Sequence, residues 1–399
     1  MNQFLRFVLL TLCLALAACG GGGISVVGMG GSGNGSGVGS GGTGITTSAV
    51  GIGVVDGFGS VIVNGVRFAT DTAQIISEDA DSLRLGMTVM VSGTINADLT
   101  TGIATTVLST PEFRGPVTEV DAVAGELALL DSRVSVDEAT VYDGFPSLST
   151  IPMGATLQVY ALPDGDGSWR ATRIEAADAS DPLIMSGAIQ DLDVASRTFR
   201  LGGKVVNYGA SSFVGNWVTA SLVNGMTIYV RTAAMPVNGV VNAQMIRQGH
   251  TLPTTGKFAA NLLGIVSNFS SLSSEFVLYG TRVNAASALI TGGPSASIGN
   301  GVKLEVAGTM ADGVLIATRA RIRHIPGTGG PASFELIGVV GRYQSIADFL
   351  VNGQPVNASG VNVVFINGSP ASLRSGARVI VRGSQVMSGV LQAGEIRFE

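Results

Sequence analysis

The sequence predicts an all-β protein: a tandem array of about five small OB-like antiparallel β-barrels that follows a disordered N-terminal tether. Three observations lead to this fold class. Apolar and polar residues alternate with a period of two after about residue 50. A set of glycine and aliphatic landmarks recurs every 68 to 76 residues. Charged residues make up 13% of the chain, against roughly 25% in typical domains, while glycine is abundant, as suits short strands and tight turns.

The first 18 residues are predicted to be a lipoprotein signal peptide. Arg6 supplies a positive start, and the apolar run Phe7 to Leu16 is too short to span a bilayer. The stretch Leu16-Ala17-Ala18-Cys19 resembles the bacterial lipobox, which implies acylation of Cys19 and attachment to a membrane through the acyl chains. An ordinary secretory signal would instead leave Cys19 as an unpaired thiol. Gly20, where this resemblance would place Asp for inner-membrane retention, implies sorting to the outer membrane.

Residues 19–49 are expected to be the lipidated cysteine and a flexible glycine-rich tether, because glycine-rich chain behaves as a random coil. Within it, Gly28 to Gly33 matches the G-x-G-x-x-G pattern of dinucleotide-binding sites. That pattern works only between a strand and the start of a helix, and no helix-forming run follows it. The sequence therefore predicts no nucleotide cofactor, and no other cofactor.

The repeats are predicted at 50–109, 113–177, 185–248, 262–324 and 336–399, called copies one to five below. Each has a central glycine before an alternating strand, at Gly86, Gly154, Gly225, Gly301 and Gly376. Each ends on an aliphatic residue, at Val107, Ile174, Ile246, Ile322 and Ile396. A two-residue hairpin turn falls earlier, at Asn64-Gly65, Asp131-Ser132, Gly202-Gly203, Tyr279-Gly280 and Asn352-Gly353.

Several short antiparallel strands in about 60 residues favour a small closed barrel, because closure removes exposed sheet edges. An OB-like barrel is the first choice and a small open sandwich the second. A lone domain of about 60 residues buries only about 60% of its unfolded surface. We therefore expect neighbouring copies to pack on one another.

The repeat also resembles a known family. Its opening G-x-V, its hairpin, the run L-x-x-G-x-x-V-x-V and a closing A-x-x-I are similar to the bacterial domain-of-unknown-function family 5666. The closing alanine is present at Ala104, Ala171, Ala243 and Ala393, whereas copy four has Arg319 at that offset. The resemblance implies a fold and transfers no catalytic residues.

Few residues suggest chemistry, and no catalytic residue is predicted. His250 and His324 lie in joints between copies without other metal-ligating residues at suitable spacing, so both are interpreted as polar loop residues. Asp164 and Asp166 are the one candidate for a Ca²⁺ site, but the later glutamate of a calcium loop is missing, and a turn is the preferred interpretation. The acidic run from Glu78 to Asp81 is interpreted as a solvated loop.

Two further groups of residues bear on binding. Arg319, Arg321, Arg323 and His324 form a basic cluster, interpreted as a solvated strand face rather than a nucleic-acid groove, because the net charge is −5. Phe213, Trp217 and Tyr229 could line a groove for carbohydrate or peptide, or belong to a core.

Together these features predict an outer-membrane-anchored lipoprotein that presents tandem β-barrel modules for binding or structural roles in the cell envelope. Its ligand-binding residues are unknown at this stage, and its expected partner is an envelope protein or glycan. One alternative is an envelope-polymer hydrolase with its site in one diverged repeat. The second alternative is OB-like binding of single-stranded nucleic acid, which the acidic charge makes an unexpected partner.

Overall fold

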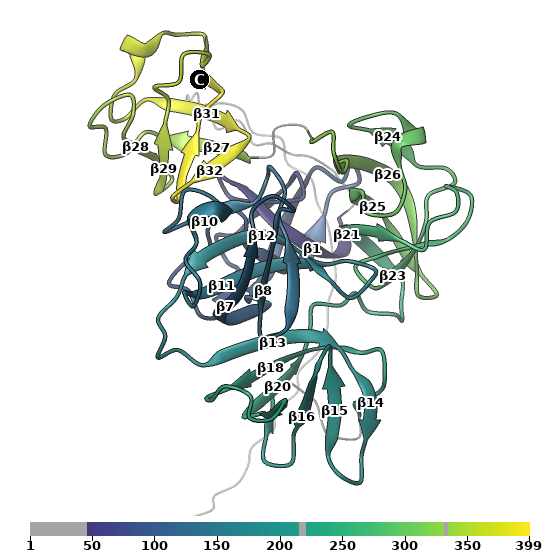
Figure 1. The fold of residues 1–399 in the computed structure, drawn as a ribbon. Coiled ribbons are helices and arrows are strands. Elements are labelled where there is room, and N and C mark those ends of the chain that lie inside the picture. The colour runs from purple at the N-terminus through teal and green to yellow at the C-terminus, as the bar shows by residue number, and fades with distance from the viewer. Residues whose placement is uncertain (1–45, 215–220, 331–333) are drawn as a thin grey trace, which may run out of the picture. The chain divides into compact units, whose positions relative to one another are not determined.

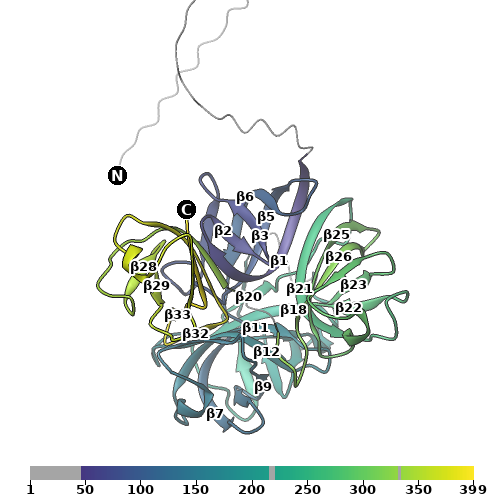
Figure 2. The ribbon, with the colours of Figure 1, turned by 90° about the horizontal axis from the view of Figure 1, so that it is seen from above.

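The computed structural model describes residues 46–214, 221–330 and 334–399, and it confirms the all-β prediction. Strands and short 3₁₀ turns are the regular elements of this part of the chain, which contains no α-helix. The 3₁₀ turns with described bounds are η1 (Leu148–Thr150), η3 (Ser295–Ser297) and η4 (Pro370–Ser372). In Figures 1 and 2 the copies follow one another in colour, from purple in copy one to yellow in copy five.

In copy one the strand pairs close into a ring. Its strands are β1 (Thr47–Phe58), β2 (Val61–Val63), β3 (Val66–Ala69), β4 (Gln74–Ser77), β5 (Thr88–Ile95) and β6 (Thr101–Ser109). The order of pairing is β1-β2-β3-β6-β5 and back to β1, with β3 and β6 parallel and the other pairs antiparallel. Such closure leaves few backbone groups unpaired at an edge.

Copies two and four close in the same order. Copy two contains β7 (Phe113–Asp121), β8 (Glu126–Leu129), β9 (Ser132–Ser135), β10 (Val141–Asp143), β11 (Thr156–Pro163) and β12 (Trp169–Ala176). Copy four contains β21 (Phe258–Ser267), β22 (Phe276–Leu278), β23 (Thr281–Asn284), β24 (Leu289–Thr291), β25 (Lys303–Ala311) and β26 (Val314–His324). In each, the fourth short strand, β10 or β24, adds to the last strand in parallel.

In copies three and five the strands are divided between two sheets, because both the first and the last long strand are interrupted. Copy three has β13 (Leu183–Ala188), β14 (Gln190–Asp193), β15 (Thr198–Leu201), β16 (Lys204–Asn207), β17 (Ser212–Phe213), β18 (Thr227–Thr232), β19 (Val240–Asn242) and β20 (Met245–Gln248). Copy five has β27 (Phe334–Val339), β28 (Phe349–Val351), β29 (Gln354–Asn357), β30 (Val364–Ile366), β31 (Arg378–Gly383), β32 (Gln385–Met387), β33 (Val390–Gln392) and β34 (Glu395–Phe398). The OB-like assignment of the barrels remains a prediction.

The hairpin turn explains why each copy opens on a glycine. Asn64 has a positive φ of 51° at the turn, and its side-chain amide donates to the Ile52 carbonyl at 2.9 Å. A Cβ at Gly53 would lie 1.9 Å from the Asn64 Oδ1 atom, so only glycine fits beneath the turn. Copy five repeats the arrangement, with Asn352 against Gly338.

Two landmarks predicted from the sequence were misplaced. The copy-two turn uses Leu130 and Asp131, which have positive φ, rather than Asp131 and Ser132. In copy four, Ala320 pairs with Val306, the position that the closing aliphatic residue takes in the other copies, so Ile322 lies two residues too late. The closing alanine of that copy is therefore Ala317, which pairs with Gly308.

Copy one contacts all four other copies. Its first strand β1 pairs in parallel with β21 of copy four, from Ala49↔Ala259 to Ile52↔Leu262. The far end of β1 pairs in parallel with β27 of copy five, at Gly57↔Glu335 and Phe58↔Leu336. Ion pairs connect copy one to copies two and three, as described below. The described part of the chain from residue 46 onward is thus held together by shared sheets as well as side chains.

Each copy also has its own cluster of buried aliphatic and aromatic side chains, and these clusters meet at the joints. The cluster of copy one includes Tyr160 from copy two and Ala259 from copy four. The cluster of copy four takes in Ile52 and Leu162. Within the described residues, no helix is long and apolar enough to cross a membrane.

Candidate functional site

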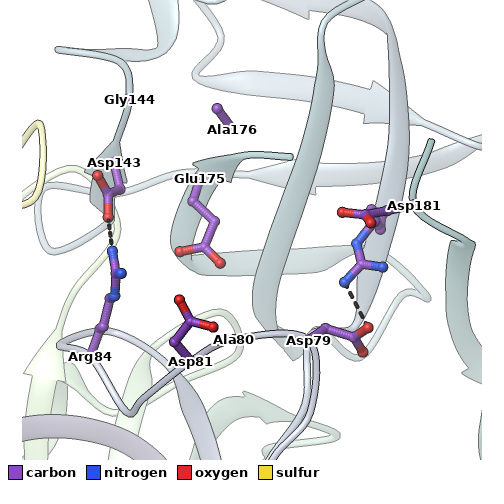
Figure 3. A pocket seen from close by; sticks show the side chains of 10 residues that line it. Asp79, Ala80, Asp81, Arg84, Asp143, Gly144, Glu175, Ala176 and Asp181 are labelled. Atoms are coloured by element: carbon purple, nitrogen blue, oxygen red, sulfur yellow. Dashed lines mark hydrogen bonds and ion pairs between the residues drawn. The ribbon is translucent and has the colours of Figure 1, made fainter. Parts of the chain in front are cut away.

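A polar cleft of about 560 Å³ lies between copies one and two (Figure 3). Carboxylates dominate its lining, with two arginines among them: Asp79, Asp81, Arg84, Arg114, Asp143, Glu175 and Asp181. The copy-one residues come from the loop between β4 and β5. The copy-two residues come from the start of β7, from the ends of β10 and β12, and from the chain that follows β12. The cleft exists only because the two copies pack together.

Asp79 is the centre of the ion-pair network on one side of the cleft. Its two oxygens accept from Arg114 of copy two at 2.9 Å and from Arg231 of copy three at 2.5 Å. The Arg114 side chain is only 3% exposed and also donates to Gln158. A carboxylate held by two guanidinium groups on different copies fixes those copies relative to each other.

The other side of the cleft has a second network. Asp143 accepts from Arg84 at 3.0 Å and also from Arg173. Arg173 in turn donates to Glu175 at 2.7 Å and to the Leu85 carbonyl of copy one at 3.2 Å. Arg173 is the largest of the fully buried side chains in the described chain, so its charge depends on these acceptors.

Two carboxylates of the cleft remain available. Figure 3 shows Asp81 pointing into the cleft beneath Glu175. Neither Asp81 nor Asp181 makes a side-chain ion pair or hydrogen bond with any residue that the structure describes. The lining can therefore accept hydrogen bonds from hydroxyl, amine or guanidinium groups of a polar ligand.

The prediction of a solvated loop for the acidic run from Glu78 to Asp81 is right for the exposed Asp81 and wrong for Glu78 and Asp79. Glu78 accepts from Arg247 of copy three at 2.9 Å, and the Asp79 side chain is 10% exposed. Both carboxylates are held at the junction of copies one, two and three. No nearby residue in the sequence indicates this, since their arginine partners belong to other copies.

Glu112 is a buried titratable group that the sequence did not indicate. It lies in the joint before β7 and accepts from the Ala161 amide at 2.8 Å and from the Thr88 hydroxyl at 3.0 Å. Burial raises the pKa of Glu112 to about 8, because ionisation in an apolar surrounding is unfavourable. The group is enclosed and does not line the cleft.

Both histidines are buried; His250 lies in a loop after β20, as predicted, whereas His324 belongs to a strand. His250 is 6% exposed and its Nε2 atom lies 3.4 Å from the Thr110 hydroxyl. Burial, and then the nearby Arg247 charge, lower the pKa of His250 to about 3. His324 is the last residue of β26 and contacts Glu138 of copy two at 2.6 Å. Neither belongs to a group of three potential metal ligands in the described ranges.

The Asp164–Asp166 segment forms a turn between β11 and β12. Asp164 pairs with Arg170 at 3.3 Å, and Asp166 accepts from the amide and hydroxyl of Ser168. Both carboxylates therefore have hydrogen-bond or ion-pair partners within the protein and need no bound cation. In the described ranges no group of three or more histidines, cysteines or acidic residues could hold a metal ion.

The basic cluster of copy four is not the solvated strand face that was predicted. Arg323 is 7% exposed and pairs with Asp56 of copy one at 3.1 Å and with Glu305 at 2.7 Å. Arg319 donates to the Leu99 carbonyl of copy one at 2.7 Å. Arg319 and Arg323 therefore join copy four to copy one, and His324 contacts copy two.

Of the copy-three aromatics, the structure describes Phe213 and Tyr229, which have different packing partners. Tyr229 is buried under the Arg247 guanidinium, 4.6 Å from the ring centre. Phe213 packs edge-on against Tyr208, with ring centres 6.5 Å apart. Trp217 and the predicted lipidation residue Cys19 lie outside the described residues.

The comparison with known families identifies the repeats. The family model described as a domain of unknown function (DUF5666) matches residues 52–107, 114–175, 264–321 and 338–397, which together are more than half of the chain. The chain belongs to this family. The DUF5666 matches coincide with copies one, two, four and five, and so confirm the tandem resemblance inferred from the sequence.

Other comparisons add little to the DUF5666 assignment. No curated protein matches the sequence. A solved structure titled "drosophila Unr CSD456" is similar at 15% sequence identity. The match covers 53% of this chain and 96% of that one with a TM-score of 0.14, so it supports no functional argument.

Proposed function

We propose that this DUF5666 protein is a lipid-anchored outer-membrane lipoprotein whose copies act together as one non-catalytic scaffold. In this proposal Cys19 is the acylated residue and the glycine-rich tether separates the scaffold from the membrane. The clefts between copies bind a hydrophilic component of the cell envelope, a glycan or a polar protein segment.

The main observation in support of a single scaffold is that strands of different copies pair in the same sheet. The parallel pairs β1–β21 and β1–β27 continue the backbone hydrogen bonding of copy one into copies four and five. Independent domains joined by flexible linkers would not need such strand pairs. Each would bind its ligand separately, and linkage would raise the overall affinity only through effective concentration. A fused set of copies can instead form sites from residues of several copies, as the cleft does.

The arrangement of the cleft supports binding rather than turnover. Asp79, Asp143 and Glu175 each accept hydrogen bonds from arginine, which holds carboxylates as fixed acceptors. A hydrolase would need a proton donor beside a free carboxylate or an activated water. The raised-pKa carboxyl, Glu112, is enclosed in a joint between copies and touches no cleft residue through its hydrogen bonds.

Metabolic labelling with a radiolabelled fatty acid tests the anchor. We expect the wild-type protein to carry label and to fractionate with the outer membrane, and the Cys19→Ala variant to lose both. Label that persists in the variant, or wild-type protein without label, would refute the anchored form and leave an exported soluble scaffold. Hydrolysis of purified envelope polymer by the wild type would refute the non-catalytic assignment.

A further inference from the structure

A second, smaller cavity lies where copies one, four and five meet. Its volume is about 310 Å³, and four arginines contribute to its lining: Arg67, Arg321, Arg323 and Arg382. Two carboxylates, of Asp56 and Glu335, line it as well. Among the lining residues themselves, arginines outnumber acids two to one. Glu305 and Glu395, outside the lining, pair with two of these arginines.

Two of the arginines are already neutralised by acids. Arg323 pairs with Asp56 and with Glu305, and Arg382 donates to Glu335 at 2.6 Å and to Glu395 at 3.0 Å. Both carboxylates that line the cavity, Asp56 and Glu335, thus form ion pairs with Arg323 and Arg382 respectively.

The other two arginines make no ion pair with a described residue, although Arg321 lies opposite Glu305 in the β25–β26 pairing and is close enough to Glu305 and Asp56 to favour their ionised forms. Neither Arg67 nor Arg321 forms an ion pair or a side-chain hydrogen bond with any residue in the described ranges. Arg67 is on the outward face of β3, between the buried Val66 and Phe68. The Arg321 Nη1 atom lies 3.6 Å from the Cβ position of Gly65, in the turn that precedes β3. Both guanidinium groups line the cavity with hydrogen-bond donors that no described residue accepts.

We propose that this cavity binds an oxyanion of the phosphate class, held by Arg67 and Arg321. Planar guanidinium groups pair with the oxygens of phosphate through parallel hydrogen bonds, which favours arginine at such sites. A cavity of this volume holds a phosphate group with room beside it. The anion is either free or part of a larger molecule such as a lipid head group.

The neighbouring surface gives such a larger molecule room to extend. Arg67 also lines a groove of about 950 Å³ between copies one and five. Hydroxyl and amide side chains, including Ser60, Asn352 and Gln354, line that groove. The inference rests on the proposed function only in requiring that copies one, four and five stay together.

Calorimetric titration of the full chain with inorganic phosphate, at constant ionic strength set with chloride, tests the site. We expect saturable binding that weakens about tenfold in Arg67→Gln and in Arg321→Gln, as removal of one charged hydrogen-bond donor predicts. The double variant should show no binding. Arg342→Gln, which removes an exposed charge of copy five away from the cavity, should bind as the wild type does. Circular dichroism and the unfolding midpoint establish that each variant is folded.

Flotation with vesicles identifies the source of the anion. If the protein binds phosphatidylglycerol vesicles but not phosphatidylcholine vesicles, and the double variant binds neither, the anion is a lipid head group. If the protein binds phosphate but neither kind of vesicle, the anion is a soluble phosphate compound. Absence of phosphate binding by the wild type, or equal binding by the double variant, would overturn the proposal. The vesicle experiment uses the Cys19→Ala chain, because acyl chains would hold the wild type to vesicles of either lipid. Its outcome is therefore independent of the labelling test.

Discussion

Replacement of Glu112 by glutamine should remove a pH-dependent loss of stability from the protein. In the folded protein the pKa of Glu112 is about 8, against an ordinary value of 4.5. Between these values the folded state binds one more proton than the unfolded state. Stability from this group is therefore fully present below pH 4.5 and is lost as pH rises toward 8.

The magnitude follows from the shift. Each pH unit in this window changes the free energy of unfolding by about 1.4 kcal/mol. Between pH 6.5 and pH 8.5 the wild type should lose about 2 kcal/mol through Glu112 alone. The Glu112→Gln side chain can still accept from the Ala161 amide and can donate to the Thr88 hydroxyl, which itself donates to the Thr110 carbonyl. We therefore expect the variant to fold and to be more stable than the wild type at pH 8.5.

The choice of pH range separates Glu112 from its neighbour His250. The pKa of His250 is lowered to about 3 from 6.5, so its stability contribution is present above pH 6.5 and is lost as pH falls toward 3. It opposes the effect of Glu112 below pH 6.5 and is constant above it. Burial also raises the pKa of Asp56 and of Glu305, but both are common to the two proteins. The difference between the wild type and Glu112→Gln over this range therefore reports on Glu112.

Urea unfolding followed by the fluorescence of Trp169 is a suitable assay, in a Trp217→Phe background. Trp169 is 5% exposed and packs edge-on against Phe113, the residue after Glu112, with ring centres 5.2 Å apart. The exposed-pair variant Glu275→Gln should keep the wild-type pH dependence. An equal loss of stability in the wild type and in Glu112→Gln would show that Glu112 does not carry the effect.

Three further predictions concern stability, measured by urea unfolding. Asn64→Gly keeps the positive φ but loses three buried hydrogen bonds, and should lower the free energy of unfolding by about 3 kcal/mol. Asn352→Gly loses one exposed hydrogen bond and should lower it by about 1 kcal/mol. Equal losses of stability in the two variants would contradict this account of the turn. Gly53→Ala should destabilise by about 2 to 3 kcal/mol, whereas Gly51→Ala, whose Cβ would be 3.7 Å from its nearest neighbour, should be nearly neutral. Asp79→Asn should cost about 3 kcal/mol by leaving two arginines without their acceptor, and should expose the joint between copies two and three to protease; a loss below about 0.5 kcal/mol would refute its role.

The elements within each copy could be predicted because their signals are local. Alternation of apolar residues identifies a strand and its buried face, and a turn such as Asn64-Gly65 needs positive φ at both positions, which few residues accept. The copy-four error has the same origin. Ala320 takes the closing position there and Ile322 follows two residues later, so that a search for the more aliphatic residue selects the wrong one.

Contacts between copies could not be predicted, because their partners are distant in the chain. Asp79 and Arg231 are separated by 152 residues, and nothing near Asp79 in the sequence marks it as buried. Arg323 alternates with apolar residues as an exposed strand residue would, yet it is buried by Asp56 of copy one. A charge on the outer face of a barrel becomes a buried charge when another barrel covers it, and only the packing of the two barrels reveals that.

The pairing of β1 with β21 has a consequence for how the number of repeats can change. In linear repeat proteins each unit touches its sequence neighbours, so units can be added or lost at an end. Here the first copy pairs with the fourth and the fifth, across intervening units. Loss of copy four or of copy five would remove a strand that pairs with β1, so selection should act on the five units as one inherited block.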